Sequence, residues 1–296
     1  MNSRRKWIQS IFTILTNANF PGFMTGQVYS GGFKHICAPG LNCYACPGAL
    51  GSCPMGTLQN SLGDPSFRSG FYAAGFLTLF GAAFGRLVCG FLCPFGLLQE
   101  LLYVPAAQIG RRWPAAGRFL GKTYAHPMFR HLKYAILLLP VILLPLFALD
   151  RFGFGAPWFC KYICPAGMLM GAGPVLAAQP ALHPLIGWIF SLKLAICIAV
   201  VLLSMASHRF FCKYLCPLGA VYGLFNRISL YRMSVDAEKC VSCGTCRKVC
   251  PMGADPTEKP NGTECIRCGK CTGSCPHGAI SCSFKGTRPA RRPQHS

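Results

Sequence analysis

Long apolar stretches alternate along the chain with short segments that are rich in glycine, proline and cysteine. Three of the stretches, at about 71–92, 133–149 and 185–206, are apolar and long enough to cross the roughly 30 Å hydrocarbon core of a bilayer. The second contains Pro140 and Pro145, which membrane helices tolerate because neighbouring helices satisfy the freed carbonyl groups. This pattern predicts three transmembrane helices.

Two weaker apolar stretches accompany these spans. Residues 1–29 begin with basic side chains and are interrupted by Pro21, so they predict either an N-terminal anchor or a weak first transmembrane helix. Residues 166–178 are too short to cross the membrane, which favours a re-entrant segment. We therefore expect residues 71–234 to form an all-α polytopic membrane domain, with three or four transmembrane helices in the whole chain.

Charge sets the expected orientation of the spans. The chain has 29 basic and 8 acidic side chains and a formal net charge of +21. Residues 103–132 carry basic side chains and no acidic one, and such loops stay on the cytoplasmic side of the inner (plasma) membrane. The first and third spans then run inward. No nucleic-acid-binding motif accompanies the charge, so the expected partner of the basic segments is the lipid bilayer and not nucleic acid.

The strongest motif lies in residues 235–284. Four cysteines follow the pattern C-x₂-C-x₂-C-x₃-C-P, and four more repeat it. Such runs wrap thiolates around [4Fe–4S] clusters, and in two-cluster ferredoxins the fourth cysteine of each run ligates the other cluster. The two expected ligand sets are Cys240, Cys243, Cys246 and Cys275 (site I) and Cys265, Cys268, Cys271 and Cys250 (site II).

Structural zinc is the alternative for these eight cysteines. Zinc usually takes two separated C-x₂-C pairs, without a three-residue last gap and a following proline. The pattern therefore predicts a C-terminal α+β domain of the bacterial two-[4Fe–4S] ferredoxin type, at 235–284, followed by a basic tail at 285–296.

A second motif, C-x₃-C-P-x-G, occurs three times beside the apolar stretches, ending at Cys93, Cys164 and Cys216. Proline suits the first turn of a helix, whose free N–H groups and dipole favour an anionic cluster. Glycine lets the backbone approach the sulfur atoms closely. Because the first and third spans both run inward, two of the pairs should meet at the cytoplasmic face. We expect a third cluster there, at site III, which consists of Cys89, Cys93, Cys212 and Cys216.

Six more cysteines are expected near the outer face. They are Cys37, Cys43, Cys46 and Cys53 in the glycine-rich loop 30–70, and the Cys160/Cys164 pair. Cys43, Cys46 and Cys53, with either Cys37 or the Cys160/Cys164 pair, form a candidate fourth cluster site. Two disulfides in an exported loop are the alternative. A cluster here would extend electron transfer across the bilayer, provided that the loops dip inward, because the two surfaces lie about 30 Å apart.

A few residues outside these motifs also carry chemistry. Lys193 lies within the third span, where a lysine is a candidate counter-charge for a cluster or a contact for a proton or quinone; snorkelling to the interface is the alternative. Lys161 and Lys213 lie inside C-x₃-C loops and either raise a cluster's potential or are interfacial basic residues. Cys197 and Cys282 have no partner spacing and are expected to be packing residues.

The motifs resemble those of a known family. Residues 91–100 (Phe-Leu-Cys-Pro-Phe-Gly-Leu-Leu-Gln-Glu) and 211–220 (Phe-Cys-Lys-Tyr-Leu-Cys-Pro-Leu-Gly-Ala) precede a doubled ferredoxin motif, as in membrane ferredoxin-type proteins of the NapH/NosR/CcoG group. The resemblance covers about 71–280. It implies a polytopic inner-membrane protein with cytoplasmic clusters, which passes electrons from quinol toward periplasmic reductases or assists copper-enzyme assembly. The third C-x₃-C-P pair and the cysteine-rich loop indicate a separate branch.

The expected function is membrane-bound electron transfer through [4Fe–4S] clusters. Electrons would pass between a cytoplasmic donor or acceptor and a membrane or extracytoplasmic partner, with a ferredoxin, a quinone or a reductase subunit as candidates. The alternatives are a factor that reduces or delivers a metal during metalloenzyme assembly, and an iron–sulfur redox sensor. The sequence has no C-x-x-C-H haem motif, no Gly-rich nucleotide loop and no Ser/His/Asp arrangement, so no separate catalytic site is expected.

Overall fold

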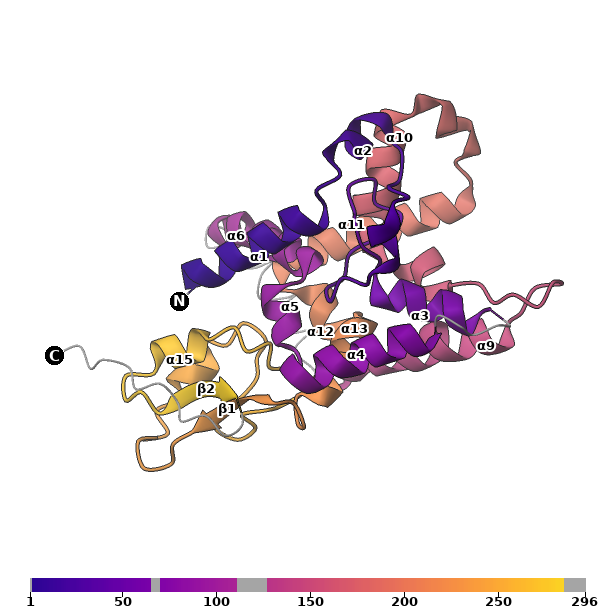
Figure 1. The fold of residues 1–296 in the computed structure, drawn as a ribbon. Coiled ribbons are helices and arrows are strands. Elements are labelled where there is room, and N and C mark those ends of the chain that lie inside the picture. The colour runs from indigo at the N-terminus through magenta and orange to yellow at the C-terminus, as the bar shows by residue number, and fades with distance from the viewer. Residues whose placement is uncertain (1, 65–69, 111–126, 285–296) are drawn as a thin grey trace.

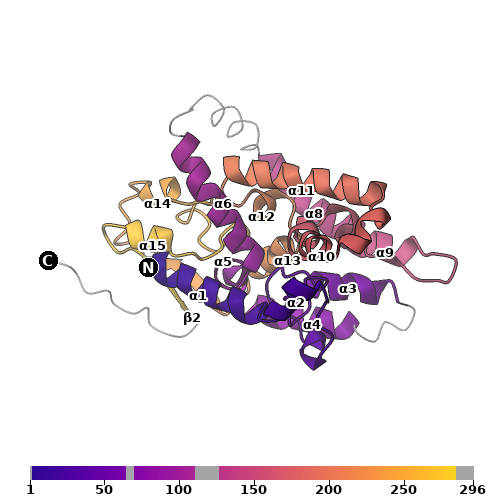
Figure 2. The ribbon, with the colours of Figure 1, turned by 90° about the horizontal axis from the view of Figure 1, so that it is seen from above.

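The structure is a computed structural model that describes residues 2–64, 70–110 and 127–284. In these parts the chain forms a helical body and a smaller module with two short strands (Figures 1 and 2). Most of the basic segment that determines the predicted orientation lies outside the described residues, as does the basic tail 285–296. The orientation in the membrane therefore stays a prediction.

The first half of the body surrounds the cysteine-rich loop. Its elements are α1 (Asn2–Thr16), α2 (Phe20–Thr25), the 3₁₀ helix η1 (Gly32–His35), α3 (Pro54–Leu62), α4 (Gly70–Phe84), α5 (Leu87–Phe91) and α6 (Pro94–Gly110). α1 packs against α5 and α6 and buries Arg5 there, while Trp7, Ile11 and Ile14 are exposed. An exposed apolar face of this kind is typical of a helix at a lipid surface.

A glycine divides the first predicted span. We expected one helix over 71–92, but α4 ends at Phe84 and Gly85 follows with a φ of +55°. A left-handed residue ends a helix because the chain can no longer continue the right-handed hydrogen-bond pattern. The chain turns at Arg86, which is fully buried, and resumes as α5. The turn places Cys89 in the protein interior.

The second and third predicted spans are helices that are long and apolar enough to cross a membrane. They are Met128–Phe147 and α11 (Trp188–Ala206). The first combines η2 (Pro127–His131), α8 (Leu132–Ile136), the π-helix η3 (Leu137–Leu143) and α9 (Leu144–Phe147). Only 22% and 17% of their apolar windows are buried, unlike core helices of soluble proteins. α4 is a shorter apolar helix, so the expected count of three or four spans stays a prediction.

The segment between these two helices folds back on the N-terminal part. It contains the π-helices η4 (Phe159–Ile163) and η5 (Gly167–Ala172), α10 (Gly173–Ala178) and the 3₁₀ helix η6 (Pro180–Leu185). The predicted re-entrant piece therefore is helical, and α10 packs against α2 at the end of the body far from the two strands (Figure 1). After α11 follow α12 (Phe210–Tyr214) and α13 (Pro217–Phe225).

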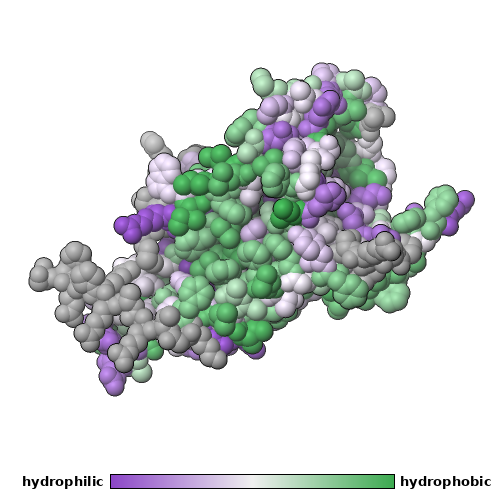
Figure 3. All heavy atoms as spheres, viewed as in Figure 1, coloured by the Kyte–Doolittle hydropathy of each residue, from purple (hydrophilic) through white to green (hydrophobic). Residues whose placement is uncertain are grey.

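A broad hydrophobic face covers the helical body (Figure 3). Exposed large apolar side chains lie on several of its helices: Trp7, Ile11, Phe71, Leu79, Leu138, Leu139, Leu194, Ile198 and Leu202. Soluble monomers rarely expose apolar surface on this scale, and such surface marks a membrane or a protein interface.

The C-terminal module has the predicted α+β character. β1 (Tyr231–Val235) pairs antiparallel with β2 (Ile280–Phe284), and the short helices α14 (Thr245–Lys248) and α15 (Lys270–Ser274) lie between them in sequence. Met233 and Ile280 form its small core with two of the predicted cluster cysteines, Cys246 and Cys271. The module lies next to α5 (Figure 1).

Candidate iron–sulfur centres

Four Cys-Pro-x-Gly turns in the helical body share one hydrogen bond. In each turn the glycine N–H donates to the sulfur of the cysteine three residues earlier. The pairs are Cys53 with Gly56, Cys93 with Gly96, Cys164 with Gly167, and Cys216 with Gly219. Proline is the first residue of α3, α6 and α13, where a missing N–H breaks no helical bond. Each turn therefore offers a sulfur that already accepts an N–H, which favours its thiolate form.

Site III assembles from two such turns on different helices. Cys89 lies on α5 and Cys212 on α12, while Cys93 and Cys216 directly precede α6 and α13. All four side chains are buried, and they interact electrostatically with one another. The structure thus brings together the four cysteines that the sequence analysis grouped in site III.

Further N–H groups point at these sulfur atoms. The Leu41 N–H donates to Cys93 Sγ over 3.4 Å, and Gln99 Nε2 donates to Cys212 Sγ over 3.1 Å. Gln99 Oε1 in turn accepts from the Phe211 N–H over 3.0 Å, which fixes the amide orientation. Hydrogen bonds to the sulfur atoms are one of the means by which a protein tunes the potential of a cluster.

Two fully buried arginines flank site III. Arg86 Nη2 donates to the carbonyl of Cys212 over 2.8 Å, and Arg209 Nη1 donates to the carbonyl of Cys89 over 2.6 Å. Arg209 also pairs with Glu100 at 2.8 Å. Buried cations require nearby negative charge. Because a [4Fe–4S] cluster ligated by four thiolates is net negative, these arginines fit a cluster at site III.

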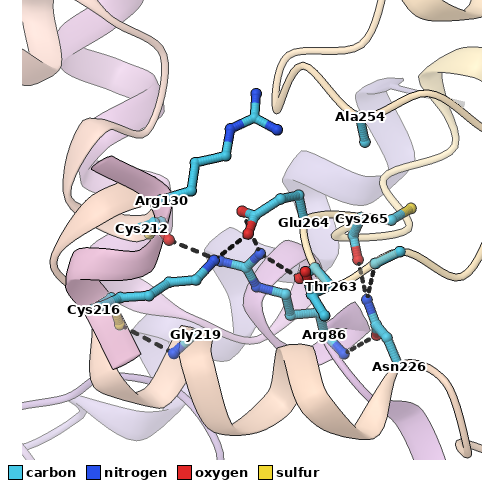
Figure 4. Close-up of polar contacts among 12 residues, drawn as sticks. Arg86, Arg130, Cys212, Cys216, Gly219, Asn226, Ala254, Thr263, Glu264 and Cys265 are labelled. Carbon is cyan, nitrogen blue, oxygen red and sulfur yellow. Dashed lines mark hydrogen bonds and ion pairs between the residues drawn. The ribbon is translucent and has the colours of Figure 1, made fainter. Parts of the chain in front are cut away.

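Arg86 also joins the helical body to the module (Figure 4). Its Nη1 donates to the Thr263 carbonyl over 2.7 Å and to the Glu264 carboxylate over 3.0 Å. Lys133, near the start of the second predicted span, binds the same carboxylate. Burial opposes ionisation of Glu264, but these two cations hold its pKa below the ordinary value. An ionised Glu264 therefore ties the module to α8 and to the turn before α5.

Two cavities of the module match the expected crossed ligand sets. One is lined by Cys240, Cys243, Cys246 and Cys275, and the other by Cys250, Cys265, Cys268 and Cys271. Cys243 is exposed, so site I is open to solvent. Site II faces the helical body, because a Cβ built on Gly90 of α5 would come within 2.6 Å of the Ile266 carbonyl. Ligation at both sites stays a prediction.

A larger cavity of about 370 Å³ lies between the cysteine-rich loop and η4–η5. Four of the six outer cysteines line it, and we call this set site IV: Cys43, Cys53, Cys160 and Cys164. The other two do not line it, since the Cys37 thiol contacts Thr57 and the Cys46 thiol contacts Asn17. All twenty cysteines lie within the described residues, and none forms a disulfide there.

The lysines singled out from the sequence have different surroundings. Lys193 lines the site IV cavity and interacts electrostatically with two of its cysteines, which favours a counter-charge over snorkelling. Lys213 interacts with Cys250 of site II, and Lys161 is exposed. Cys197 is buried in α11, outside the four sites.

Two family profiles, both described as "4Fe-4S binding domain", match the chain. The first, Fer4_5, matches residues 68–114, 134–172 and 188–234, which include the three C-x₃-C-P pairs. The second, Fer4, matches 233–254 and 259–281, the two ferredoxin runs. The chain therefore binds several [4Fe–4S] clusters.

The chain is also similar in sequence to individual proteins, including ferredoxin-type proteins. Uncharacterized protein MJ0750 of Methanocaldococcus jannaschii is 31% identical over 202 residues, 68% of this chain and 73% of the relative. Uncharacterized protein MJ0749 of the same organism is 29% identical over 177 residues, 59% and 55% of the two chains. Ferredoxin-type protein NapH of Haemophilus influenzae is 29% identical over 195 residues, 60% and 52% of the two chains. This chain belongs to the NapH-like family of ferredoxin-type proteins.

The NapH-like relatives are covered to different extents. Apart from MJ0750, the chain spans between 23% and 60% of the length of the relatives that it matches, about half in most cases. No solved structure matches the chain. Membership of the NapH-like family therefore extends to the iron–sulfur domains, and not to the activity of a whole relative.

Zinc remains the alternative metal for clustered cysteines in a NapH-like chain. In the parts of the chain that the structure describes, no three His, Cys, Asp or Glu side chains converge closely enough to hold a single ion. The observation that favours iron–sulfur clusters is the spacing along the chain, because zinc usually takes two separated C-x₂-C pairs without a three-residue last gap and a following proline.

Several residues that support the NapH-like sites were not predicted from the sequence. Glu264 lies in no motif and Glu100 only ends the stretch 91–100, and their partners Arg86 and Arg5 are 178 and 95 positions away. Gln99 could have been found, because Cys-Pro-x-Gly-x-Leu-Gln occurs twice, at 53–59 and 93–99.

Proposed function

We propose that the chain relays single electrons between a cytoplasmic redox protein and a partner in or beyond the membrane. The observation that carries this proposal is the contact between sites II and III, where Arg86 bridges Glu264 of the module and the Cys212 carbonyl. [4Fe–4S] clusters, when bound, exchange one electron at a time at potentials set by charge, hydrogen bonds and exposure. Related chains are named as electron-transport or ferredoxin-type proteins, which supports this role.

The residues between sites II and III keep them close together and dry. Met252 and Ile266 of the module belong to the same buried apolar cluster as Cys89 and Cys216 of site III. Close packing matters because electron tunnelling weakens steeply with distance. Site I, with the exposed Cys243, is the end at which a soluble redox protein can dock.

We further propose a multi-pass protein of the inner membrane with the module on the cytoplasmic side. Arg130 and Lys133 lie at the start of the second span, and both contact the module, through Gly253 and Glu264. Basic residues that flank a span favour its cytoplasmic end. Metal delivery is less well supported, because Met55, a candidate soft ligand in the outer loop, is fully buried.

Electron transfer across sealed vesicles tests this function. The protein is purified without oxygen, reconstituted into liposomes that contain ferricyanide, and exposed to dithionite outside. We expect rapid loss of the internal ferricyanide absorbance with the wild-type chain and with Cys197→Ser, a buried cysteine outside the four sites. Cys93→Ser should abolish the transfer while the EPR signals of the module persist. Wild-type rates in Cys93→Ser would contradict a route through site III.

A further inference from the structure

The two halves of site III recur elsewhere in the chain. Cys-Pro-Phe-Gly-Leu-Leu-Gln at 93–99 has a counterpart in Cys-Pro-Met-Gly-Thr-Leu-Gln at 53–59. Phe-Cys-Lys-Tyr-Leu-Cys-Pro-Leu-Gly at 211–219 has a counterpart in Phe-Cys-Lys-Tyr-Ile-Cys-Pro-Ala-Gly at 159–167. The chain therefore contains two copies of each half.

Segments 53–59 and 159–167 contact each other in the same way as segments 93–99 and 211–219. Gln59 Nε2 donates to Cys160 Sγ over 3.3 Å, and Gln59 Oε1 accepts from the Phe159 N–H over 3.0 Å. Gln99 makes the same two bonds, to Cys212 and from Phe211, over 3.1 and 3.0 Å. A long-range contact that is reproduced atom for atom indicates that both pairs of segments form one kind of site.

One ligand position differs between the two sites. Cys89 stands four residues before Cys93, but the equivalent position before Cys53 is Ala49. Cys43, which lies earlier in the loop than Ala49, takes this place and lines the cavity with the other three cysteines. Site IV thus keeps four thiols.

Glycines keep the site IV cavity open. A Cβ built on Gly171 would lie 3.5 Å from Cys43 Sγ, and one built on Gly56 would lie 3.8 Å from Cys160 Sγ. At Gly167 it would lie 2.8 Å from Lys193 Nζ, which extends into the same space. The cavity therefore combines four sulfur atoms, one cation and walls from which side chains are missing.

We propose that Cys43, Cys53, Cys160 and Cys164 hold a further [4Fe–4S] cluster, with Lys193 as its counter-charge. Four thiolates carry excess negative charge, and the ammonium group of the half-buried Lys193, which lines the cavity, offsets part of it. Cys43 and Cys53 lie outside every segment that the family profiles match. Cys37 and Cys46 are not ligands, because they lie outside the cavity.

Site IV adjoins site III. The Leu41 N–H contacts Cys93 Sγ, and Cys43 follows two residues later, about 7 Å of extended chain at most. Tyr222, whose hydroxyl donates to the Pro39 carbonyl over 3.0 Å, belongs to the same buried apolar cluster as Cys89 of one site and Cys53 of the other. The role of a cluster at site IV rests on the proposed function, but its presence does not, because cluster binding can be measured without electron transfer.

Iron and sulfide analysis of the full chain, purified without oxygen, tests the site. Cys43→Ser and Cys164→Ser should each lose about one quarter of the iron, one cluster in four, while the EPR signals of the other clusters persist. The matched controls are Cys37→Ser and Cys46→Ser, from the same loop, which should retain all of it. Unchanged iron in Cys43→Ser and Cys164→Ser overturns the proposal, as does an equal loss in the controls.

A second variant leaves all four thiols in place. Lys193→Met should shift one EPR signal to lower potential in a redox titration, and Lys6→Met, at an exposed position of α1, should shift none. Unchanged potentials in Lys193→Met would overturn the assigned counter-charge. If Cys43→Ser and Cys164→Ser lose iron but still transfer electrons in the vesicle assay, the cluster at site IV is supported and only an electron route through it is contradicted. Cluster binding and electron transfer can therefore fail separately.

Discussion

Gln99 and Gln59 offer a matched pair of substitutions at the scale of single residues. Each amide donates to one cysteine sulfur, of site III and site IV respectively. Such bonds raise a cluster's reduction potential because they stabilise the additional charge of the reduced state. Gln99→Met is expected to lower one cluster potential and Gln59→Met a different one, as measured by redox-titrated EPR. Gln27→Met, at an exposed position, serves as control. A shift of the same signal in both variants would contradict the assignment.

Glu264 is the common partner of Arg86 and Lys133, so its charge should matter for stability. Glu264→Gln leaves two buried cations without their partner and is expected to destabilise the fold by about 3–5 kcal/mol, measured by thermal unfolding at neutral pH. The pKa of Glu264 is lowered in the folded state. Its contribution is therefore complete above the unfolded-state pKa and is lost as the pH falls through the folded-state value.

An exposed ion pair provides the control for Glu264. Asp236 pairs with Lys239 at the surface of the module, where water screens the charges. Asp236→Asn should leave the unfolding temperature unchanged. An equal effect of both substitutions would show that burial of Glu264 adds nothing.

At the scale of single residues, the sequence was sufficient to predict the sets of cysteines, but not the residues that surround them. Iron–sulfur ligands are local in sequence, so the spacing alone grouped the sets that line the two module cavities. Gln99 and Arg86 act on residues 113 and 178 positions away. Contacts of this kind depend on how helices pack, which no local pattern encodes.

At the scale of secondary-structure elements, the close approach of the module to α5 depends on Gly90. A Cβ at this position would come within 2.6 Å of the Ile266 carbonyl, a backbone atom that cannot rotate away. Gly90→Ala should therefore separate the module from α5 and slow electron transfer between sites II and III in the vesicle assay. Gly75→Ala, in α4, meets no atom within 4 Å and should transfer at the wild-type rate. Equal rates in both variants would contradict a tight interface.

The first predicted span shows why helix ends are harder to predict than helix composition. Residues 71–92 carry one charged side chain, Arg86, in an otherwise largely apolar stretch, but Gly85 adopts a left-handed conformation that the hydrophobic pattern does not reveal. The backbone there is fixed by tertiary contacts, since Asn226 Oδ1 accepts from the N–H of Arg86. The position of the cysteine-rich loop beside site III likewise depends on a tertiary contact, the hydrogen bond from the Leu41 N–H to Cys93 Sγ.

On the scale of the whole molecule the four sites form a series. Site I is open to solvent at Cys243, site II meets the helical body at Gly90, and site III adjoins site IV through Leu41 and the apolar cluster around Tyr222. From the sequence, sites III and IV were expected at opposite membrane surfaces, about 30 Å apart. In the structure the cysteine-rich loop contacts site III through Leu41, so the distance between the two sites is shorter and a continuous route for electrons is physically reasonable.

Such a route is useful only if lipid surrounds the helical body, and two apolar side chains that are both more than half exposed test this. Ile198, near the middle of α11, is 51% exposed, and Val241, in the module, is 59% exposed. In water both positions would tolerate aspartate with changes within about 0.5 kcal/mol. In a bilayer an aspartate at a helix centre is unfavourable by about 2.5–3.5 kcal/mol. Ile198→Asp should therefore reduce the amount of protein in the membrane fraction several-fold, while Val241→Asp should not. Equal amounts of the two variants would mean that α11 does not face lipid, because exposure alone cannot distinguish the two positions.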